Sequence, residues 1–290
     1  MYGAIIGDVV GSTYEFEGIK TTQFPLLPGR SSFTDDSILT IAVAAALMRS
    51  QETGLAFSTL VEEELLRWGN EYPNPMGGYG TRFHQWLFSK DPAPYNSCGN
   101  GSAMRVSACG LFAVTLEEAL ELAEASSLPT HNHPEGIKGA KATAAAIFLA
   151  KTGHSKDEIK AYIEEYFYPL DRTVEQIRKD YEFDGTCQGS VPESIIAFLE
   201  SKNYEDAIRL TISLGGDADT MAAITGAIAW SFYRFQTSKG ISVKMANLWI
   251  KVADLLPPDW LDMIPEFDRL CRSREEEFRR TGSVAPVRLV

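Results

Sequence analysis

The sequence has few cysteines, few histidines and no long hydrophobic run. Its four cysteines form no CxxC or CxxH pair, which argues against zinc, a redox couple or a disulfide scaffold. We therefore expect reduced thiols in a cytoplasmic protein, with Cys109 and Cys271 in the core. The longest apolar, uncharged runs, residues 38–48 and 221–233, are shorter than the ~20 residues that span a bilayer. The first residues lack a basic segment, so no targeting sequence is expected.

Positive charge is scarce as well. The chain has 27 Lys and Arg against 39 Asp and Glu, a net charge of −12. This charge repels polyphosphates at long range and argues against duplex nucleic acid or an anionic membrane as partners. An anionic ligand would therefore need donors that its own binding site supplies.

The hydrophobic pattern is helical from end to end, and period-2 alternation is almost absent. No repeat, low-complexity tract or long linker divides the chain, so we predict one all-α domain over residues 1–290, a compact multi-helix bundle. Capping-box spacings, Thr115 with Glu118 and Ser155 with Glu158, support two of the helix starts. The predicted helices cover residues 57–69, 116–126, 137–152, 155–167, 174–181, 192–201, 204–214 and 265–280.

Three further segments are apolar on nearly every face and are predicted to lie at the centre of the bundle. They are residues 38–48, 140–150 and 221–232. Near the N-terminus, glycines spaced four apart line one face of a helical segment, and we interpret them as a close helix–helix contact rather than a ligand site. These glycines are Gly3, Gly7 and Gly11.

Two groups of acidic and hydroxyl residues directly precede two of the apolar segments. Each group by itself is explained by N-capping and by the helix dipole, which favour Thr and Asp at helix starts. The groups are Thr34, Asp35 and Asp36 before residues 38–48, and Asp217, Asp219 and Thr220 before residues 221–232.

The repetition of this pattern indicates one shared site. If the two helix starts meet, four carboxylates converge, and unit charges ~4 Å apart repel by ~4 kcal/mol at an effective dielectric of ~20. Bound cations would relieve this repulsion. Oxygen ligands without His or Cys suit Mg²⁺, or alternatively Mn²⁺, better than zinc, and four carboxylates can share two such ions.

Other segments offer groups that can bind or react. Glu15, flanked by aromatic residues, is a candidate general base or metal ligand; on residue type alone a solvated side chain is favoured, and Glu17 competes for the role. A loop of small residues that runs into a helical pattern can present backbone N–H groups to a phosphate. Its candidate binding residues are Gly99, Asn100, Gly101 and Ser102.

Arg105 and His131 each admit two interpretations. Arg105 either reaches a phosphate or pairs with a carboxylate, and we favour the pair. His131 either hydrogen-bonds to a ligand or has a structural role, with neither favoured. His84 and His154 are expected to be ordinary, partly exposed residues.

Taken in order, these segments resemble the ADP-ribosylglycohydrolase family. The resemblance implies an orthogonal all-α bundle with a binuclear magnesium site at helix N-termini that holds ADP-ribose. It implies that Glu15 is a base or ligand, that the loop 99–102 holds the diphosphate region, and that His131 contacts the ligand. The segments that carry it are residues 3–18, 33–37, 99–107, 130–136 and 215–229. The metal ligands that it implies are Thr34, Asp35, Asp36, Asp217, Asp219 and Thr220.

The same resemblance implies hydrolysis of the N-glycosidic bond between C1″ of ADP-ribose and an acceptor, with Glu15 or Asp36 as the base. ADP-ribosyl-arginine on a protein is the expected substrate, and a monomer is expected. Serine-linked, nucleobase-linked or small-molecule ADP-ribose are alternative substrates. Aromatic residues such as Tyr79, Phe83 or Trp86 would determine which acceptor the enzyme prefers. A non-catalytic ADP-ribose binder, or an immunity partner that blocks a toxin, is the alternative from another class.

Overall fold

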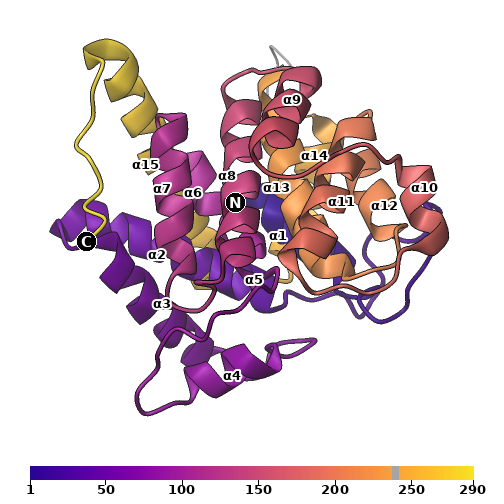
Figure 1. Cartoon of the computed structure of the whole chain (residues 1–290), viewed down its shortest axis with the longest axis horizontal. Helices are drawn as coiled ribbons and strands as arrows, with labels where there is room; N and C mark the ends of the chain where they lie inside the picture. The colour runs from indigo at the N-terminus through magenta and orange to yellow at the C-terminus, as the bar shows by residue number, and fades with distance from the viewer. Residues whose placement is uncertain (237–241) are drawn as a thin grey trace.

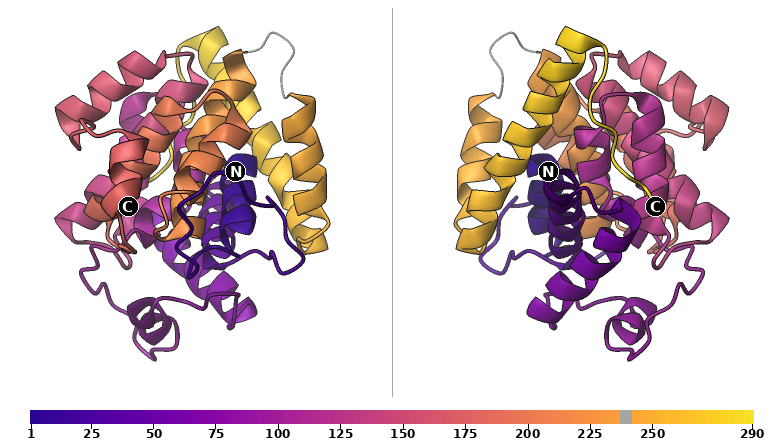
Figure 2. Two further views of the ribbon diagram at one scale, coloured as in Figure 1. Left: turned by 90° about the vertical axis from the view of Figure 1, so that its right-hand side faces the viewer. Right: turned by 90° about the vertical axis from the view of Figure 1, so that its left-hand side faces the viewer.

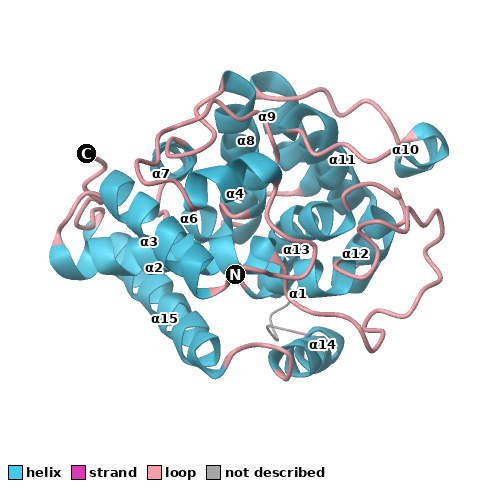
Figure 3. Ribbon diagram, turned by 90° about the horizontal axis from the view of Figure 1, so that it is seen from below, coloured by secondary structure: helices cyan, strands magenta, loops and turns pink. Residues whose placement is uncertain are grey.

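The structure is a computed structural model that describes residues 1–236 and 242–290. In these residues the chain forms helices and loops without a strand, as Figure 3 shows, so the all-α prediction is confirmed. None of the described helices is long and apolar enough to cross a membrane. The helices, labelled in Figure 1, are α1 (Tyr2–Gly11), α2 (Asp35–Thr53), α3 (Phe57–Glu71), α4 (Thr81–Leu87), α5 (Gly101–Met104), α6 (Ser107–Phe112), α7 (Leu116–Ser127), α8 (Pro134–Lys151), α9 (Lys156–Tyr166), α10 (Val174–Asp180), α11 (Cys187–Glu200), α12 (Tyr204–Ile212), α13 (Ala218–Gln236), α14 (Val243–Ala253) and α15 (Pro258–Thr281).

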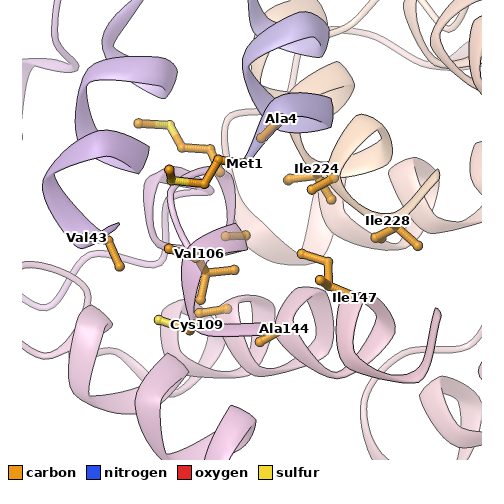
Figure 4. Packing of buried hydrophobic residues seen from close by; sticks show 14 of the residues in the cluster. Met1, Ala4, Val43, Val106, Cys109, Ala144, Ile147, Ile224 and Ile228 are labelled. Atoms are coloured by element: carbon orange, nitrogen blue, oxygen red, sulfur yellow. The ribbon is translucent and has the colours of Figure 1, made fainter. Parts of the chain in front are cut away.

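The three segments predicted to be central form the middle of α2, α8 and α13. Nearly all of their apolar side chains are buried, with Met48 at the edge of the core. Figure 4 shows Val43 of α2, Ile147 of α8 and Ile224 of α13 directed toward a common interior. The remaining helices surround this centre in the two side views of Figure 2. A helix that is apolar all round is stable in water only when others cover it, which explains the arrangement.

The predicted glycine contact joins α1 to α13. A Cβ atom on Gly7 would overlap the carbonyl oxygen of Ala222, and one on Gly3 would overlap that of Gly226. The two helix backbones therefore touch, as the glycine spacing predicted. This contact matters for function because it brings the polar residues of α1 to the start of α13, where Asp217 and Asp219 lie.

Two predicted helix starts were wrong, and both errors involve proline. We predicted a helix from residue 192, but α11 begins at Cys187 and contains Pro192. Likewise, α15 begins at Pro258 and contains Pro265, where we placed the start. Local signals explain the earlier starts. Thr186 caps α11 by accepting a hydrogen bond from the amide of Gly189. In α15 no side chain caps the start, but Pro258 occupies the first turn, where proline is favoured.

Local start signals were otherwise reliable. Ser155 and Glu158 form the predicted capping box of α9, and Thr115 caps α7. The short helix α4 and the helix α14 were not among the predicted helices. Cys109 and Cys271 are buried free thiols, as expected.

Candidate functional site

The two acidic-hydroxyl groups meet at one end of the bundle. Thr34 caps α2, where its hydroxyl accepts a hydrogen bond from the amide of Asp36 at 3.2 Å. Gly215 turns the chain into α13 with a positive φ of 75°. The hydroxyl of Thr220 then donates to Asp36 Oδ2 at 3.2 Å, across 184 residues of sequence. Thr34 therefore caps α2 at the place where the two groups meet.

Asp8 completes this arrangement and was missed by the sequence analysis. Its fully buried carboxylate accepts bonds from the amides of Thr34 and Ser37 at 3.0 and 3.1 Å. It also accepts from the Thr34 hydroxyl at 2.7 Å and from the Ser37 hydroxyl. Asp8 thus anchors the first turn of α2 to α1. The available signal was one aspartate within an otherwise apolar, glycine-faced helix.

The carboxylates form two overlapping triplets. Oxygen atoms of Asp8, Asp36 and Asp219 lie within 4.8 Å of one another, and so do oxygen atoms of Glu15, Asp217 and Asp219. Asp219 belongs to both triplets. In addition, Asp36 Oδ1 is buried without a hydrogen-bond partner in the described part of the chain. A buried carboxylate oxygen without a donor is costly, so it is suited to a ligand from outside the protein.

Burial raises the pKa of every carboxyl group in the cluster, and like charge adds to the rise at four of them, Glu15, Asp35, Asp36 and Asp219. Burial raises the pKa of Asp8 to about 6. Burial, followed by the charge of Asp217, raises the pKa of Glu15 to about 7. The pKa values of Asp35, Asp36 and Asp219 lie well above their usual range for the same two reasons. Divalent cations would reverse this effect, and a set of oxygen donors without His or Cys fits such hard ions.

A cavity of about 370 Å³ opens beside the cluster, a volume within the range of small-molecule sites. Among the predicted metal ligands, Asp35, Asp36, Asp217, Asp219 and Thr220 line it, whereas Thr34 lies behind it against Asp8. Among the predicted binding residues, the lining includes Gly99, Asn100, Gly101 and His131.

The glycine loop is more engaged with the protein than the sequence indicated. The side chain of Asn100 donates through Nδ2 to Asp217 Oδ2 at 2.8 Å. The backbone N–H of Asn100 donates to the carbonyl of Gly185. The amide of Gly99 donates to Ser97 Oγ. Ser102 is fully buried outside the cavity lining, and its hydroxyl donates to the carbonyl of Gly136 at 2.7 Å. The loop therefore positions Asp217 as well as bordering the cavity.

The two glutamates of the first loop have different surroundings. Glu15 lines the cavity and is half-buried, contrary to the solvated side chain that residue type alone favoured. Glu17 is exposed and forms an ion pair with Arg30. Geometry therefore selects Glu15 over Glu17 as the site glutamate.

The cavity lining also includes Arg82, Arg105 and His131. The favoured interpretation of Arg105 as a carboxylate partner was wrong. Its Nη2 donates instead to the carbonyl of Ser126 and to Thr130 Oγ1, both at 2.8 Å. The cavity lining therefore combines carboxylates with cationic groups.

Aromatic residues at the cavity differ from those we expected. Phe83 lines the cavity, but Tyr79 donates its hydroxyl to the carbonyl of Tyr72, and neither Tyr79 nor Trp86 is part of the lining. Phe183 does line the cavity, and it stacks with Phe16 at a centroid distance of 6.4 Å. Both of these rings are exposed. Sequence alone could not pair them, because they lie on separate loops.

Comparisons with known proteins identify the family of this chain. A family model described as ADP-ribosylglycohydrolase matches residues 1–282. The ADP-ribosylarginine hydrolase Tri1 of Serratia proteamaculans (strain 568) is 23% identical over 312 residues, which cover 96% of this chain and 77% of that protein. The ADP-ribosylhydrolase ARH3 of Homo sapiens is 28% identical over 308 residues, which cover 80% of this chain and 83% of that protein.

A solved chain from an ADP-ribosylglycohydrolase-related protein complex shares the fold. It has a TM-score of 0.61 at 22% identity and covers 87% of this chain and 95% of its own. The family match and the hydrolases among the relatives define the chain as a glycosidase-type hydrolase. The chain belongs to the ADP-ribosylglycohydrolase family, and its activity is the hydrolysis of ADP-ribosyl groups.

Proposed function

We propose that this protein hydrolyses ADP-ribosyl-arginine with the help of two divalent cations, Mg²⁺ by preference. The observation that carries the proposal is one cavity whose lining combines converging carboxylates with cationic groups. A sugar with vicinal hydroxyls suits the carboxylates once cations are bound, and a diphosphate suits the cationic groups. The Tri1 relatives, named for arginine-linked substrates, favour the same acceptor.

The residues that would hold the cations are those of the two helix starts. Bound there, the ions would orient the ribose hydroxyls and make a water molecule more acidic. Asp8 would keep the first turn of α2 in place, and Asn100 would orient Asp217. The proposed ligands are Thr34, Asp35, Asp36, Asp217, Asp219 and Thr220.

Glu15 acts as the base in this scheme. It borders the cavity and is only half-buried, so its carboxylate can reach a water molecule there. The alternative, Asp36, is nearly fully buried and accepts a bond from Thr220, so it is less able to reach a water molecule. Water adds to C1″, the bond from C1″ to the guanidine nitrogen breaks, and the proton passes to the departing guanidine. The nearby carboxylates stabilise the positive charge that develops at C1″.

The exposed pair of Phe16 and Phe183 supports an arginine acceptor. Phe183 lines the cavity and Phe16 follows Glu15 directly in the chain, so the pair lies beside the proposed base. A guanidinium group gains about 0.5–2 kcal/mol over an aromatic face. A serine hydroxyl gains nothing comparable there.

The test uses arginine-linked and serine-linked ADP-ribosyl peptides with Mg²⁺, with EDTA, and with Mg²⁺ restored. We expect ADP-ribose release from the arginine peptide, loss of release in EDTA and recovery with Mg²⁺. The change Phe183→Ala should raise KM for that peptide by about 3- to 10-fold, whereas Phe88→Ala, an exposed residue outside the cavity lining, should not. Release from the serine peptide alone would overturn the acceptor, and binding without release from either peptide would identify a non-catalytic binder.

A further inference from the structure

We propose that Lys20 is a positioning residue that ties three loops together and so fixes the aromatic pair of Phe16 and Phe183 beside the carboxylates. The inference rests on the proposed function, because it takes this pair as the site of the arginine acceptor. Lys20 is not part of the cavity lining, so it acts on the substrate only through other residues.

The first observation is the pair of hydrogen bonds that Lys20 makes. Its Nζ atom donates to the carbonyl oxygen of Tyr181 and to that of Leu214, which lie 161 and 194 residues further along the chain. Tyr181 comes shortly before Phe183, and Leu214 comes shortly before Asp217. One ammonium group therefore joins the loop after α1 both to the loop that carries Phe183 and to the turn before α13. These contacts place the aromatic pair relative to the carboxylates.

The second observation is which groups Lys20 contacts. Asp180 and Glu182 favour its charged form, although burial lowers the pKa of Lys20 overall. Asp180 nevertheless pairs with Arg172, and the Lys20 ammonium group donates to the two backbone carbonyls instead. A lysine can donate three hydrogen bonds and accepts none, so it can hold two carbonyls from different segments at once. Contacts of this kind fix the backbone of the loops, as a positioning role requires.

The third observation is the packing of the turn before α13. A Cβ atom on Gly215 would lie 2.8 Å from Lys20 Cε and 2.9 Å from the carbonyl oxygen of Gly18. A Cβ atom on Gly216 would lie 2.3 Å from Cε1 of the Tyr181 ring. The three loops therefore touch at these two glycines, with the Lys20 side chain against one and the Tyr181 ring against the other.

The aromatic pair needs such a tie because both of its members lie on loops. Phe16 and Phe183 are exposed side chains, and surface loops are more mobile than the helices they connect. The ion pair of Glu17 with Arg30 lies within the loop after α1, so it does not join this loop to that of Phe183. Lys20 does join them, and it therefore controls whether the two rings meet.

The test is a double-mutant cycle on KM for the arginine-linked peptide with Mg²⁺, in the wild type, Lys20→Met, Phe183→Ala and the double variant. We expect Lys20→Met to raise KM by about 3- to 10-fold, as Phe183→Ala does, with kcat within about 2-fold of the wild type. In the Phe183→Ala protein the same change should add less than about 2-fold, because the pair is already lost. Lys20→Arg, which keeps donors for both carbonyls, should restore most of the KM, and Lys251→Met, on an exposed lysine of α14, should leave it unchanged.

Three results would overturn the proposal. They are a wild-type KM in Lys20→Met, a fall in kcat without a rise in KM, and effects of Lys20→Met and Phe183→Ala that multiply independently. The last result would show that Lys20 only stabilises the fold, because a general loss of stability does not depend on the Phe183 ring.

Amide hydrogen exchange of the Mg²⁺-saturated protein, followed by mass spectrometry, tests the tie without turnover. Lys20→Met should speed exchange in residues 181–186 and 213–217, whereas Lys20→Arg and Lys251→Met should not. Unchanged exchange in both segments of Lys20→Met would refute the tie. If the wild type releases ADP-ribose only from a serine-linked peptide, the proposed acceptor fails, and the exchange result decides on the tie by itself. If Lys20→Met does not fold, Lys20→Gln, which is too short to reach both carbonyls, replaces it in both experiments with the same expected results.

Discussion

Asp8 is the residue on which the geometry of the site depends most directly. It lies on α1, yet its carboxylate accepts hydrogen bonds from two backbone amides and two hydroxyls at the start of α2. The proposed ligands Asp35 and Asp36 belong to that same first turn. A carboxylate that never touches the substrate can therefore control where the reacting groups lie.

We predict that Asp8→Asn lowers the free energy of unfolding by about 1–3 kcal/mol and removes most of the activity. The amide NH₂ group of asparagine would face the donors of Thr34 and Ser37, which leaves buried groups unsatisfied. Urea unfolding and a release assay measure the two effects. Asp171→Asn, on an exposed aspartate, is the matched control. Wild-type stability in Asp8→Asn would contradict this account.

Glu15 gives the cluster a predictable pH dependence in metal-free protein. Its folded-state pKa is about 7, against 4.5 for an ordinary glutamate. A carboxyl group with a raised pKa stabilises the fold fully below pH 4.5, and this contribution is lost as the pH rises through 7. Glu15→Gln should therefore be about as stable as the wild type near pH 5. At pH 8 the free energy of unfolding of Glu15→Gln should be higher by about 1–2 kcal/mol, a figure kept small because solvent screens a half-buried group.

The measurement for Glu15 is unfolding in EDTA at several pH values for both proteins. Mg²⁺ should then raise the melting temperature of the wild type more at pH 8 than at pH 5, because protons compete with the cations. A difference between the two proteins that shrinks as the pH rises would show that Glu15 is not in a cluster of like charge.

At the scale of the elements, the contact between α1 and α13 holds the two halves of the carboxylate cluster together. Asp8 and Glu15 come from α1 and the loop after it, whereas Asp217 and Asp219 come from the start of α13. The glycines on α1 allow its backbone to touch α13. Any added side chain would separate the two groups of ligands.

We predict that Gly7→Ala lowers the free energy of unfolding by about 1–3 kcal/mol, since its Cβ atom would overlap the carbonyl of Ala222 and only a backbone shift can relieve the overlap. Activity should fall as well. Gly29→Ala is the control, because a Cβ atom there meets nothing within 4 Å. Equal urea midpoints for the two variants would argue against a close contact of α1 with α13.

How much the sequence could reveal also differed between elements. Glycine spacing predicted that another helix packs closely on α1, but not that this helix is α13. Capping residues predicted the starts of α7 and α9, because these are local patterns. Proline was a poor marker: Pro192 lies within α11 because tertiary packing and the cap at Thr186 outweigh one lost hydrogen bond. Helix boundaries at proline depend on what the helix packs against, which the sequence does not show.

At the scale of the whole molecule, the candidate site was predictable where it depended on paired motifs. The two acidic-hydroxyl groups pointed to one site before their contact was known, and Thr220 does meet Asp36. The anchoring role of Asp8, the pairing of Phe16 with Phe183 and the unpaired charge of Arg105 were not predictable. Each of these depends on segments far apart in the sequence, and a charged residue alone does not reveal its partners.

The most direct test of the central claim is a count of Mn²⁺ ions bound per chain, by electron paramagnetic resonance with and without ADP-ribose. The account predicts two bound ions in the wild-type protein, and fewer in Asp219→Asn, because Asp219 contributes to both carboxylate triplets. Asp171→Asn should bind as the wild type does. Wild-type protein that leaves all Mn²⁺ free, or an Asp219→Asn variant that binds the same number of ions, would contradict it.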